Sequence, residues 1–407
     1  MENDADAYHR MHRRTLLARG LSAASLLGAS SAGFPLTSLA RAGDGWGSFA
    51  WTSAEIAMGD TLMVSAEVAG SPVRAILDSG SAASIINTRL VESLDIAPSG
   101  KRIIRGTGGR VEVTEISDVA LTVADDRRRL PFAIVSDLAA ISSAFGRPID
   151  LVLGEDILAG RCVALDFTQD RIGFAPTGSF AGGSGWRRLP LTHGTRSELL
   201  VTASIGGGSP VQLIFDLGSA NALMLSTPFV AAQDLLAGKA RSTAALGSLD
   251  GVQIVTAFVL DDIVIGEVHI AGVPVAGLDH WQSDSAVGSI GLPLIAQFDV
   301  IMDITAESLW LRPAPPKHRL PMLKDRSGFG LAVSPSALTV AHVAAHSPAE
   351  MSGWSIGDQI VRIDGRPINA SYTRGELWRW RFLPAGTHVR LVDGSGIVRR
   401  LTLADYY

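Results

Sequence analysis

The chain has 407 residues, of which 47% are hydrophobic, and a formal net charge of −5 at pH 7. This length is enough for two or three domains. Acidic residues outnumber basic ones and no extended Lys/Arg run is present, so the composition argues against a nucleic-acid partner. Cys162 is the single cysteine, which excludes a disulfide within the chain.

The first 42 residues have the pattern of an export signal. Arg13 and Arg14 precede a moderately apolar stretch from Leu21 to Leu39, and an Ala-Arg-Ala site follows at 40–42. This order is typical of a secretory signal peptide, and the Arg pair favours the twin-arginine route. A membrane anchor is the alternative, which the serines in the stretch disfavour. We expect a periplasmic or secreted protein without a membrane span after signal cleavage.

Residues 51–176 are predicted to be rich in β-strands, because short Val/Ile/Leu runs alternate with Gly, Asp and Pro turns. Within them, residues 75–86 read AILDSGSAASII. Two apolar residues lead into Asp78, and Ser79, Gly80 and Ser81 follow in a tight turn. An ordinary β-turn gives the same triplet, so this stretch alone is a weak signal.

The same pattern returns later in the chain. Asp216 stands 138 positions after Asp78, and Gly218 and Ser219 stand 138 positions after Gly80 and Ser81. Gly208–Val211 matches Gly70–Val73 at the same offset, and Ile290-Gly291 matches Leu153-Gly154 at an offset of 137. A repeat of this length predicts a duplicated unit that twice presents an Asp where a strand meets a turn.

Glycine also marks a predicted hairpin between strand-like segments, at Gly106, Thr107, Gly108 and Gly109. One interpretation is a plain connection, and the other is a flap over a binding cleft. The counterpart in the second unit is residues 246–251.

Composition places the domain boundaries. A Gly-rich stretch at 178–185 predicts a flexible spacer, and a Pro-rich stretch at 312–317 predicts a stiff linker. The expected divisions are a signal peptide at 1–42, a first lobe at 51–176, a spacer at 177–188, a second lobe at 189–311, a linker at 312–321 and a last domain at 322–407.

The paired apolar-apolar-Asp motifs, each followed by an apolar-apolar-Gly element, resemble aspartic proteases of the retropepsin and pepsin type. The resemblance covers about residues 51–312. It implies a mainly β, two-lobed, β-barrel fold with an internal duplication, and Asp78 and Asp216 as the catalytic pair. The supporting residues it implies are Ser79, Gly80, Ser81, Gly218, Ser219, Gly154 and Gly291.

The last domain resembles a small α+β PDZ domain. Gly328, Phe329, Gly330 and Leu331 look like its carboxylate-binding loop, and residues 347–349 and 357–358 look like its central signature. The resemblance implies that this domain binds the C-terminus of a peptide or protein. The whole chain is similar to bacterial retropepsin-like proteases with a C-terminal PDZ module.

This resemblance implies an endopeptidase that acts on polypeptides with a water molecule activated by two carboxyl groups. No metal or cofactor is expected, because the sequence has no H-E-x-x-H, G-x-S-x-G or phosphate-loop motif. Leu217 departs from the family, in which Ser or Thr makes a cross-lobe hydrogen bond beside the second Asp. The alternative is therefore a catalytically impaired, peptide-binding pseudoprotease of the cell envelope.

Overall fold

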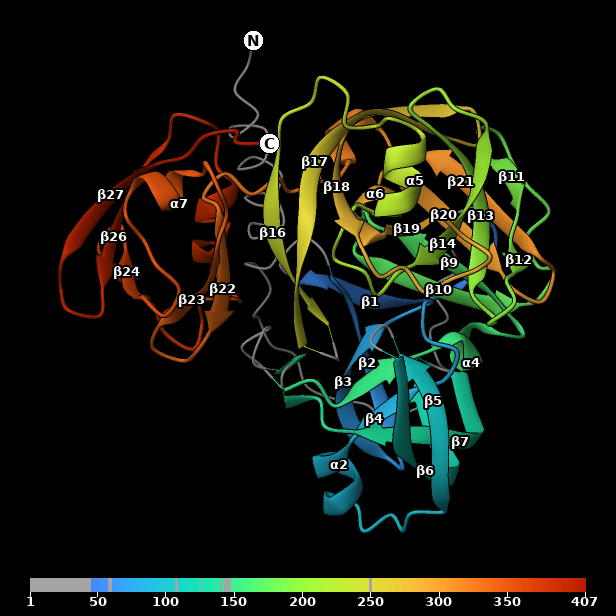
Figure 1. Ribbon diagram of the computed structural model, residues 1–407. Coiled ribbons are helices and arrows are strands. Elements are labelled where there is room, and N and C mark those ends of the chain that lie inside the picture. The colour runs from blue at the N-terminus through green and yellow to red at the C-terminus, as the bar shows by residue number, and fades with distance from the viewer. Residues whose placement is uncertain are drawn as a thin grey trace, which may run out of the picture.

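The computed structural model describes residues 45–57, 61–106, 109–124, 126–139, 141–142, 148–248 and 251–407. Strands dominate these residues and the helices are short, so the expected mainly β fold is confirmed. Figure 1 shows three parts, which we call the first lobe (50–176), the second lobe (187–313) and the C-terminal unit (322–407). No helix among the described residues is long and apolar enough to cross a membrane.

The strands of the first lobe point successive side chains to opposite faces, as in Ser71–Leu77, where Val73, Ala75 and Leu77 join the core shared by the lobes and Ile76 joins a second apolar cluster. Its elements are β1 (Ala50–Ala57), β2 (Thr61–Val68), β3 (Ser71–Leu77), β4 (Ile85–Asn87), α2 (Thr88–Ser93), β5 (Gly100–Gly106), β6 (Gly109–Val123), β7 (Asp126–Ser136), β8 (Leu151–Leu153), α4 (Glu155–Leu158), β9 (Arg161–Asp166) and β10 (Arg171–Pro176).

The second lobe follows a similar order of strands and one-turn helices. Its elements are β11 (Arg187–Pro190), β12 (Thr192–His193), β13 (Leu199–Ile205), β14 (Pro210–Asp216), β15 (Leu223–Ser226), α5 (Thr227–Ala232), β16 (Arg241–Ser248), β17 (Gly251–Ile265), β18 (Val268–Leu278), β19 (Gly288–Gly291), α6 (Leu292–Ile295), β20 (Phe298–Asp303) and β21 (Ser308–Pro313).

The two lobes pair their strands in the same way around the two Asp residues. In the first lobe β3 is parallel to β8, and β4 is antiparallel to β8 and parallel to β7. In the second lobe β14 is parallel to β19, and β15 is antiparallel to β19 and parallel to β18. The strands that deliver Asp78 and Asp216 therefore have equivalent neighbours.

A sheet shared by both lobes joins them. Its order is β11-β21-β20-β9-β10-β1, and β9 of the first lobe is antiparallel to β20 of the second. One continuous apolar core passes through both lobes and includes Leu77, Leu153, Phe215 and Leu217. The two lobes are thus parts of one folded body, with the Asp turns fixed relative to each other.

The two connecting segments are packed against the lobes. Residues 177–188, expected to be a flexible spacer, contain Trp186, which donates a hydrogen bond to the Gly45 carbonyl at 2.9 Å and contacts Phe180 and Trp46. In the linker at 312–321, the Leu320 carbonyl accepts a hydrogen bond from the Gln297 side chain at 2.7 Å. Composition alone did not reveal these aromatic and polar anchors.

The C-terminal unit has a separate apolar core that includes Phe329, Trp354 and Trp380. Its one six-residue 3-10 helix among the described residues is η2, which contributes the buried Trp378 and Trp380 to this core. The elements, with the linker helix η1 first, are η1 (Pro316–His318), β22 (Phe329–Val333), β23 (Leu338–Val343), α7 (Pro348–Met351), β24 (Gln359–Ile363), β25 (Arg366–Pro367), η2 (Leu377–Phe382), β26 (His388–Asp393) and β27 (Val398–Thr402).

Candidate active site

Two central strands deliver the two Asp side chains to one place. The β3 strand ends at Leu77, and the Asp78 N–H then donates to the Leu153 carbonyl of β8 at 2.9 Å. In the second lobe Asp216 is the last residue of β14 and pairs with Gly291 of β19. Each Asp is thereby fixed by a parallel neighbour strand at the point where its own strand ends.

The two carboxyl groups lie against each other across the lobe boundary. A Cβ atom placed on Gly80 would lie 2.9 Å from Asp216 Oδ1, and one placed on Gly218 would lie 2.5 Å from Asp78 Oδ1. Each glycine N–H also donates to the Asp of its own lobe, at 2.8 Å for Gly80 and 2.9 Å for Gly218. Glycine is needed at both positions because any side chain would collide with the opposite carboxyl group.

This proximity changes the protonation of the pair. Burial raises the pKa of Asp78, while hydrogen bonds from Gly80, Asp216 and Ser81 oppose the rise. The pKa of Asp216 is raised to about 8, first by burial and then by the charge of Asp78. Two carboxylates so close cannot both ionise at low cost, so the pair holds one proton near neutral pH. We assign that proton to Asp216, because its pKa carries the additional contribution of the Asp78 charge.

Ser79 joins the lobes beneath the two Asp residues. Its hydroxyl donates to the Phe215 carbonyl at 2.8 Å and accepts from the Leu217 N–H at 2.9 Å. The Leu217 side chain has no hydroxyl for the reciprocal bond, and its main-chain N–H is the second partner of the Ser79 hydroxyl. The Leu217 side chain is fully buried in the apolar core, where a hydroxyl would lie among apolar groups.

The two serines that follow the turns act through their main chain. The Ser81 hydroxyl donates to the Ala83 carbonyl at 2.8 Å, and the Ser219 hydroxyl accepts from the Asn221 N–H at 3.3 Å. The N–H groups of Ser81 and Ser219, together with those of Gly80 and Gly218, favour the ionised carboxylates. Both serines therefore support the carboxylates through main-chain groups, while their hydroxyls bond within their own turns.

Gly154 and Gly291 lie directly under the Asp turns. A Cβ atom on Gly154 would lie 2.6 Å from the Ala83 carbonyl carbon and 2.8 Å from the Ser81 carbonyl oxygen. A Cβ atom on Gly291 would lie 2.6 Å from the Ser219 carbonyl oxygen. Both glycines allow the backbone of a turn to pack closely on the following strand.

The predicted hairpins are present up to their tips. Gly106 of β5 pairs with Gly109 of β6, whereas Thr107 and Gly108 lie outside the described residues. In the second lobe Ser248 of β16 pairs with Gly251 of β17. Whether either hairpin covers substrate stays a prediction.

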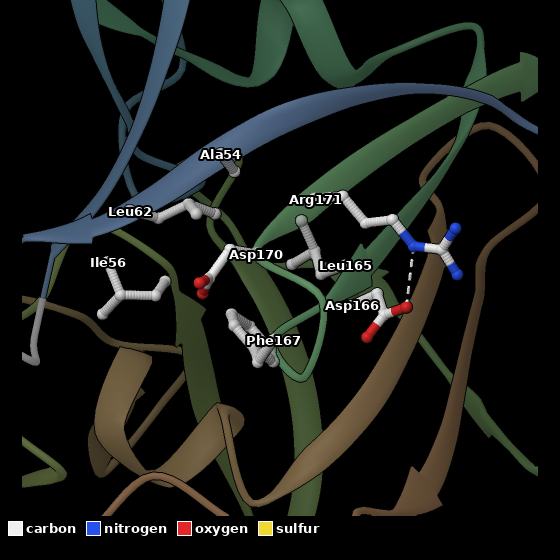
Figure 2. A pocket seen from close by; sticks show the side chains of 8 residues that line it. All are labelled: Ala54, Ile56, Leu62, Leu165, Asp166, Phe167, Asp170 and Arg171. Carbon is white, nitrogen blue, oxygen red and sulfur yellow. Dashed lines mark hydrogen bonds and ion pairs between the residues drawn. The ribbon is translucent and has the colours of Figure 1, made fainter. Parts of the chain in front are cut away.

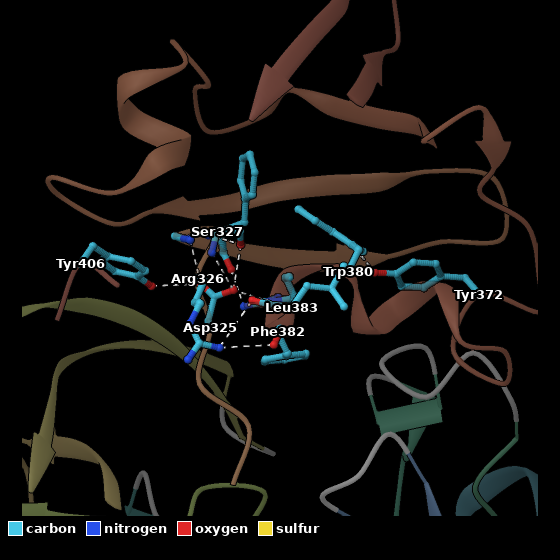
Figure 3. A network of polar contacts seen from close by, with 11 residues as sticks. Asp325, Arg326, Ser327, Tyr372, Trp380, Phe382, Leu383 and Tyr406 are labelled. Atoms are coloured by element: carbon cyan, nitrogen blue, oxygen red, sulfur yellow. Dashed lines mark hydrogen bonds and ion pairs between the residues drawn. The ribbon is translucent and has the colours of Figure 1, made fainter. Parts of the chain in front are cut away.

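The loop expected to bind a terminal carboxylate in the C-terminal unit is occupied by a side chain of the protein. Figure 3 shows this network around Asp325. Asp325 accepts hydrogen bonds from the Gly328 N–H at 2.7 Å, from Tyr406 at 2.9 Å and from Arg381 at 2.8 Å. Sequence reasoning missed Asp325, although an Asp three residues before a turn glycine is a signal for such a contact.

The other residues of this loop serve the core and the sheet. The Phe329 N–H donates to the Ser327 hydroxyl at 3.2 Å, and the buried Phe329 ring packs on Trp354 and Trp380. Gly330 and Leu331 lie in β22, where they pair with β23. The Phe329 ring therefore belongs to the core of the C-terminal unit.

Two other features of the described residues do not compete with this site. The hollow in Figure 2 lies beside Leu165, Phe167 and the ion pair of Arg171 with Asp166, away from the Asp pair, and is too narrow for a water molecule. Cys162 is buried, and burial raises the pKa of its thiol to about 12, which makes it a poor nucleophile. Among the described residues no group of three or more His, Cys, Asp or Glu could hold a metal ion.

Comparison with known proteins agrees with this geometry in the first lobe. No curated protein matches the chain. Residues 64–157 match the model of the aspartyl protease family. The matched segment runs from β2 into α4 and contains the Asp78 turn together with Gly154. A hydrolase of the peptidase type is therefore the activity that the match supports.

Proposed function

We propose that the chain is an aspartic endopeptidase in which Asp78 and Asp216 together activate a water molecule. The observation that carries this proposal is the contact of the two carboxyl groups, with a pKa of about 8 for Asp216. At neutral pH one group is then a base and the other an acid. This division of roles is what water attack on a peptide bond requires.

The reaction follows from the assigned protonation states. Asp78, as carboxylate, takes a proton from water while the water oxygen forms a bond to the peptide carbonyl carbon. Asp216, as carboxylic acid, donates its proton to the carbonyl oxygen and so stabilises the developing charge. In the second step the C–N bond breaks, the nitrogen takes the proton held by Asp78, and Asp216 regains a proton from the gem-diol. Two Asp carboxyl groups that share one proton are the general device of aspartic proteases.

We also propose that the two lobes arose by internal duplication. The 138-residue register and the matching neighbours of β3 and β14 support this. Both the base and the acid are then supplied by one chain, without a second copy.

Export and recruitment belong to the same proposal. Residues 1–42 lie outside the described residues, and the twin-arginine pattern supports a periplasmic or secreted location. Replacing Arg13 and Arg14 by Lys should block export, which fractionation of expressing cells would measure.

We also propose that the C-terminal unit recruits substrates in the manner of a PDZ domain. The Asp325 carboxylate accepts the Gly328 N–H in the structure, so the carboxylate of a ligand would have to displace Asp325 in order to bind there.

The test is cleavage of unstructured casein by the mature protein, compared with Asp78→Asn. Turnover that is lost in the variant supports the endopeptidase. Binding of a peptide by the natural protein without any turnover would instead establish the alternative, a peptide-binding pseudoprotease.

A further inference from the structure

The β22 and β23 strands of the C-terminal unit contact the β16 strand of the second lobe. In Figure 1 the β22 and β23 strands run alongside the β16–β17 hairpin. The β16 strand is the last in its sheet, so its outer side has no neighbour within the second lobe. An edge strand of this kind is a surface that another part of the molecule can cover.

Polar contacts fix this interface. The Ser242 hydroxyl donates to the Ala345 carbonyl at 2.8 Å, and Thr243 Oγ1 lies 3.0 Å from His342 Nε2. Ser242 is buried although it lies on an edge strand. Two adjacent residues of β16 thus each bond the C-terminal unit, which fixes how the strand is aligned along it.

Shape complementarity adds to these bonds. A Cβ atom on Gly330 of β22 would lie 2.7 Å from the Ala245 Cβ atom of β16. The backbone of β22 can therefore approach β16 only because residue 330 is glycine. Leu320 of the linker and Met322, the first residue of the C-terminal unit, pack on the core of the lobes and hold the connection in place.

The corresponding hairpin of the first lobe differs. Its outer strand β5 carries Ile103, which is 67% exposed, and Lys101, which forms a surface ion pair with Glu112. The outer side of β16, in contrast, is contacted by β22 and β23. The two hairpins have the same antiparallel strand pairing, but the C-terminal unit packs against the hairpin of the second lobe.

We propose that the C-terminal unit positions the β16–β17 hairpin against bound polypeptide substrate, with His342, Gly330 and Ala345 as the positioning contacts. The substrate part of this proposal rests on the proposed endopeptidase function. A substitution in β22 or β23 should therefore alter substrate binding by moving β16. The C-terminal unit does not need to contact the Asp pair for this effect.

Hydrogen exchange of the full chain tests this directly. In Thr243→Ala and His342→Ala, the amides of 241–265 should exchange about fivefold to tenfold faster, the loss expected for one or two hydrogen bonds. Gly330→Ala tests the same contact through shape. The matched controls are Thr402→Ala and His388→Ala, which break a second Thr–His pair, 2.9 Å apart, within the C-terminal unit and away from β16.

Unchanged exchange at 241–265 in all three interface variants would overturn the positioning role. With a peptide substrate, the interface variants should raise KM about threefold to tenfold and leave kcat within twofold. Faster exchange with an unchanged KM would overturn the link to substrate. If the natural protein turned over no peptide, the endopeptidase proposal would fail, and the exchange result alone would decide the positioning role.

Discussion

Asp78 and Asp216 have equivalent surroundings, yet their proton is unequally held. Both accept the N–H of the glycine two positions later, at 2.8 and 2.9 Å. The hydrogen bond between the carboxyl groups lowers the pKa of Asp78 and raises that of Asp216. One carboxyl group therefore accepts the hydrogen bond as a base while the other donates it as an acid.

Activity should depend on pH through this pair. The rate should fall above about pH 8, where Asp216 loses its proton, and fall again in acid, where Asp78 gains one. A pH profile of kcat/KM for a neutral peptide would measure both limbs. An activity that still rises above pH 9 would contradict the assignment of the proton to Asp216.

The raised pKa of Asp216 also predicts a pH-dependent stability. The folded state keeps a proton that the unfolded chain loses near pH 4, so the free energy of unfolding should fall by up to about 1.4 kcal/mol per pH unit between about pH 4 and 8. Asp216→Asn should flatten this slope in urea denaturation. An equal slope in the variant would show that other groups cause it.

Ser79 offers a second test at this scale. Ser79→Ala leaves the Phe215 carbonyl and the Leu217 N–H without their buried partner, which should cost about 2–3 kcal/mol of unfolding free energy and lower kcat. Ser81→Ala is the control, since the Ser81 hydroxyl bonds only the nearby Ala83 carbonyl among the contacts described. Equal losses in the two variants would count against the cross-lobe link.

At the scale of elements, the sequence predicted the strands near each Asp well. The apolar run before Asp78 became β3, and the Leu-Gly of 153–154 became the end of β8 and the residue after it, because local pattern determines both. The β9–β20 pairing could not be predicted, since it joins strands of different lobes more than 130 positions apart. The Asp325 contact was missed for another reason: a loop that could bind a ligand carboxylate binds a nearby one of the chain.

The close packing beneath the turns should be sensitive to one methyl group. Gly154→Ala would push a Cβ atom into the main chain of Ala83 and Ser81, at a cost of about 1–3 kcal/mol and with loss of activity. Gly375→Ala is the control, because its nearest neighbour would be 3.5 Å away. Thermal unfolding of both variants measures the difference, and equal melting temperatures would contradict the packing.

At the scale of the whole molecule, the lobes share one core and one sheet, whereas the C-terminal unit has a core of its own. Elements with a common core unfold together, and separate cores allow separate transitions. The chain should therefore show one calorimetric transition for both lobes and another for the C-terminal unit.

Asp325→Asn identifies which transition is which. The substitution leaves the partly buried Arg381 without its carboxylate partner and should destabilise the C-terminal unit by about 3 kcal/mol, with the lobe transition unchanged. Glu376→Gln is the control, because it breaks only an exposed ion pair with Arg379 and should cost less than about 1 kcal/mol. A shift of both transitions by Asp325→Asn would mean that the molecule is one cooperative unit.

The most direct measurement of the central claim is kcat/KM for Asp78→Asn, Asp216→Asn and the double variant, with the exposed Asp137→Asn as a folding control. Groups that act as a unit are non-additive, so each single variant should lose at least about 1,000-fold and the double variant should be no worse than either. Near-full activity in either single variant, or losses that multiply in the double variant, would contradict a shared proton between Asp78 and Asp216.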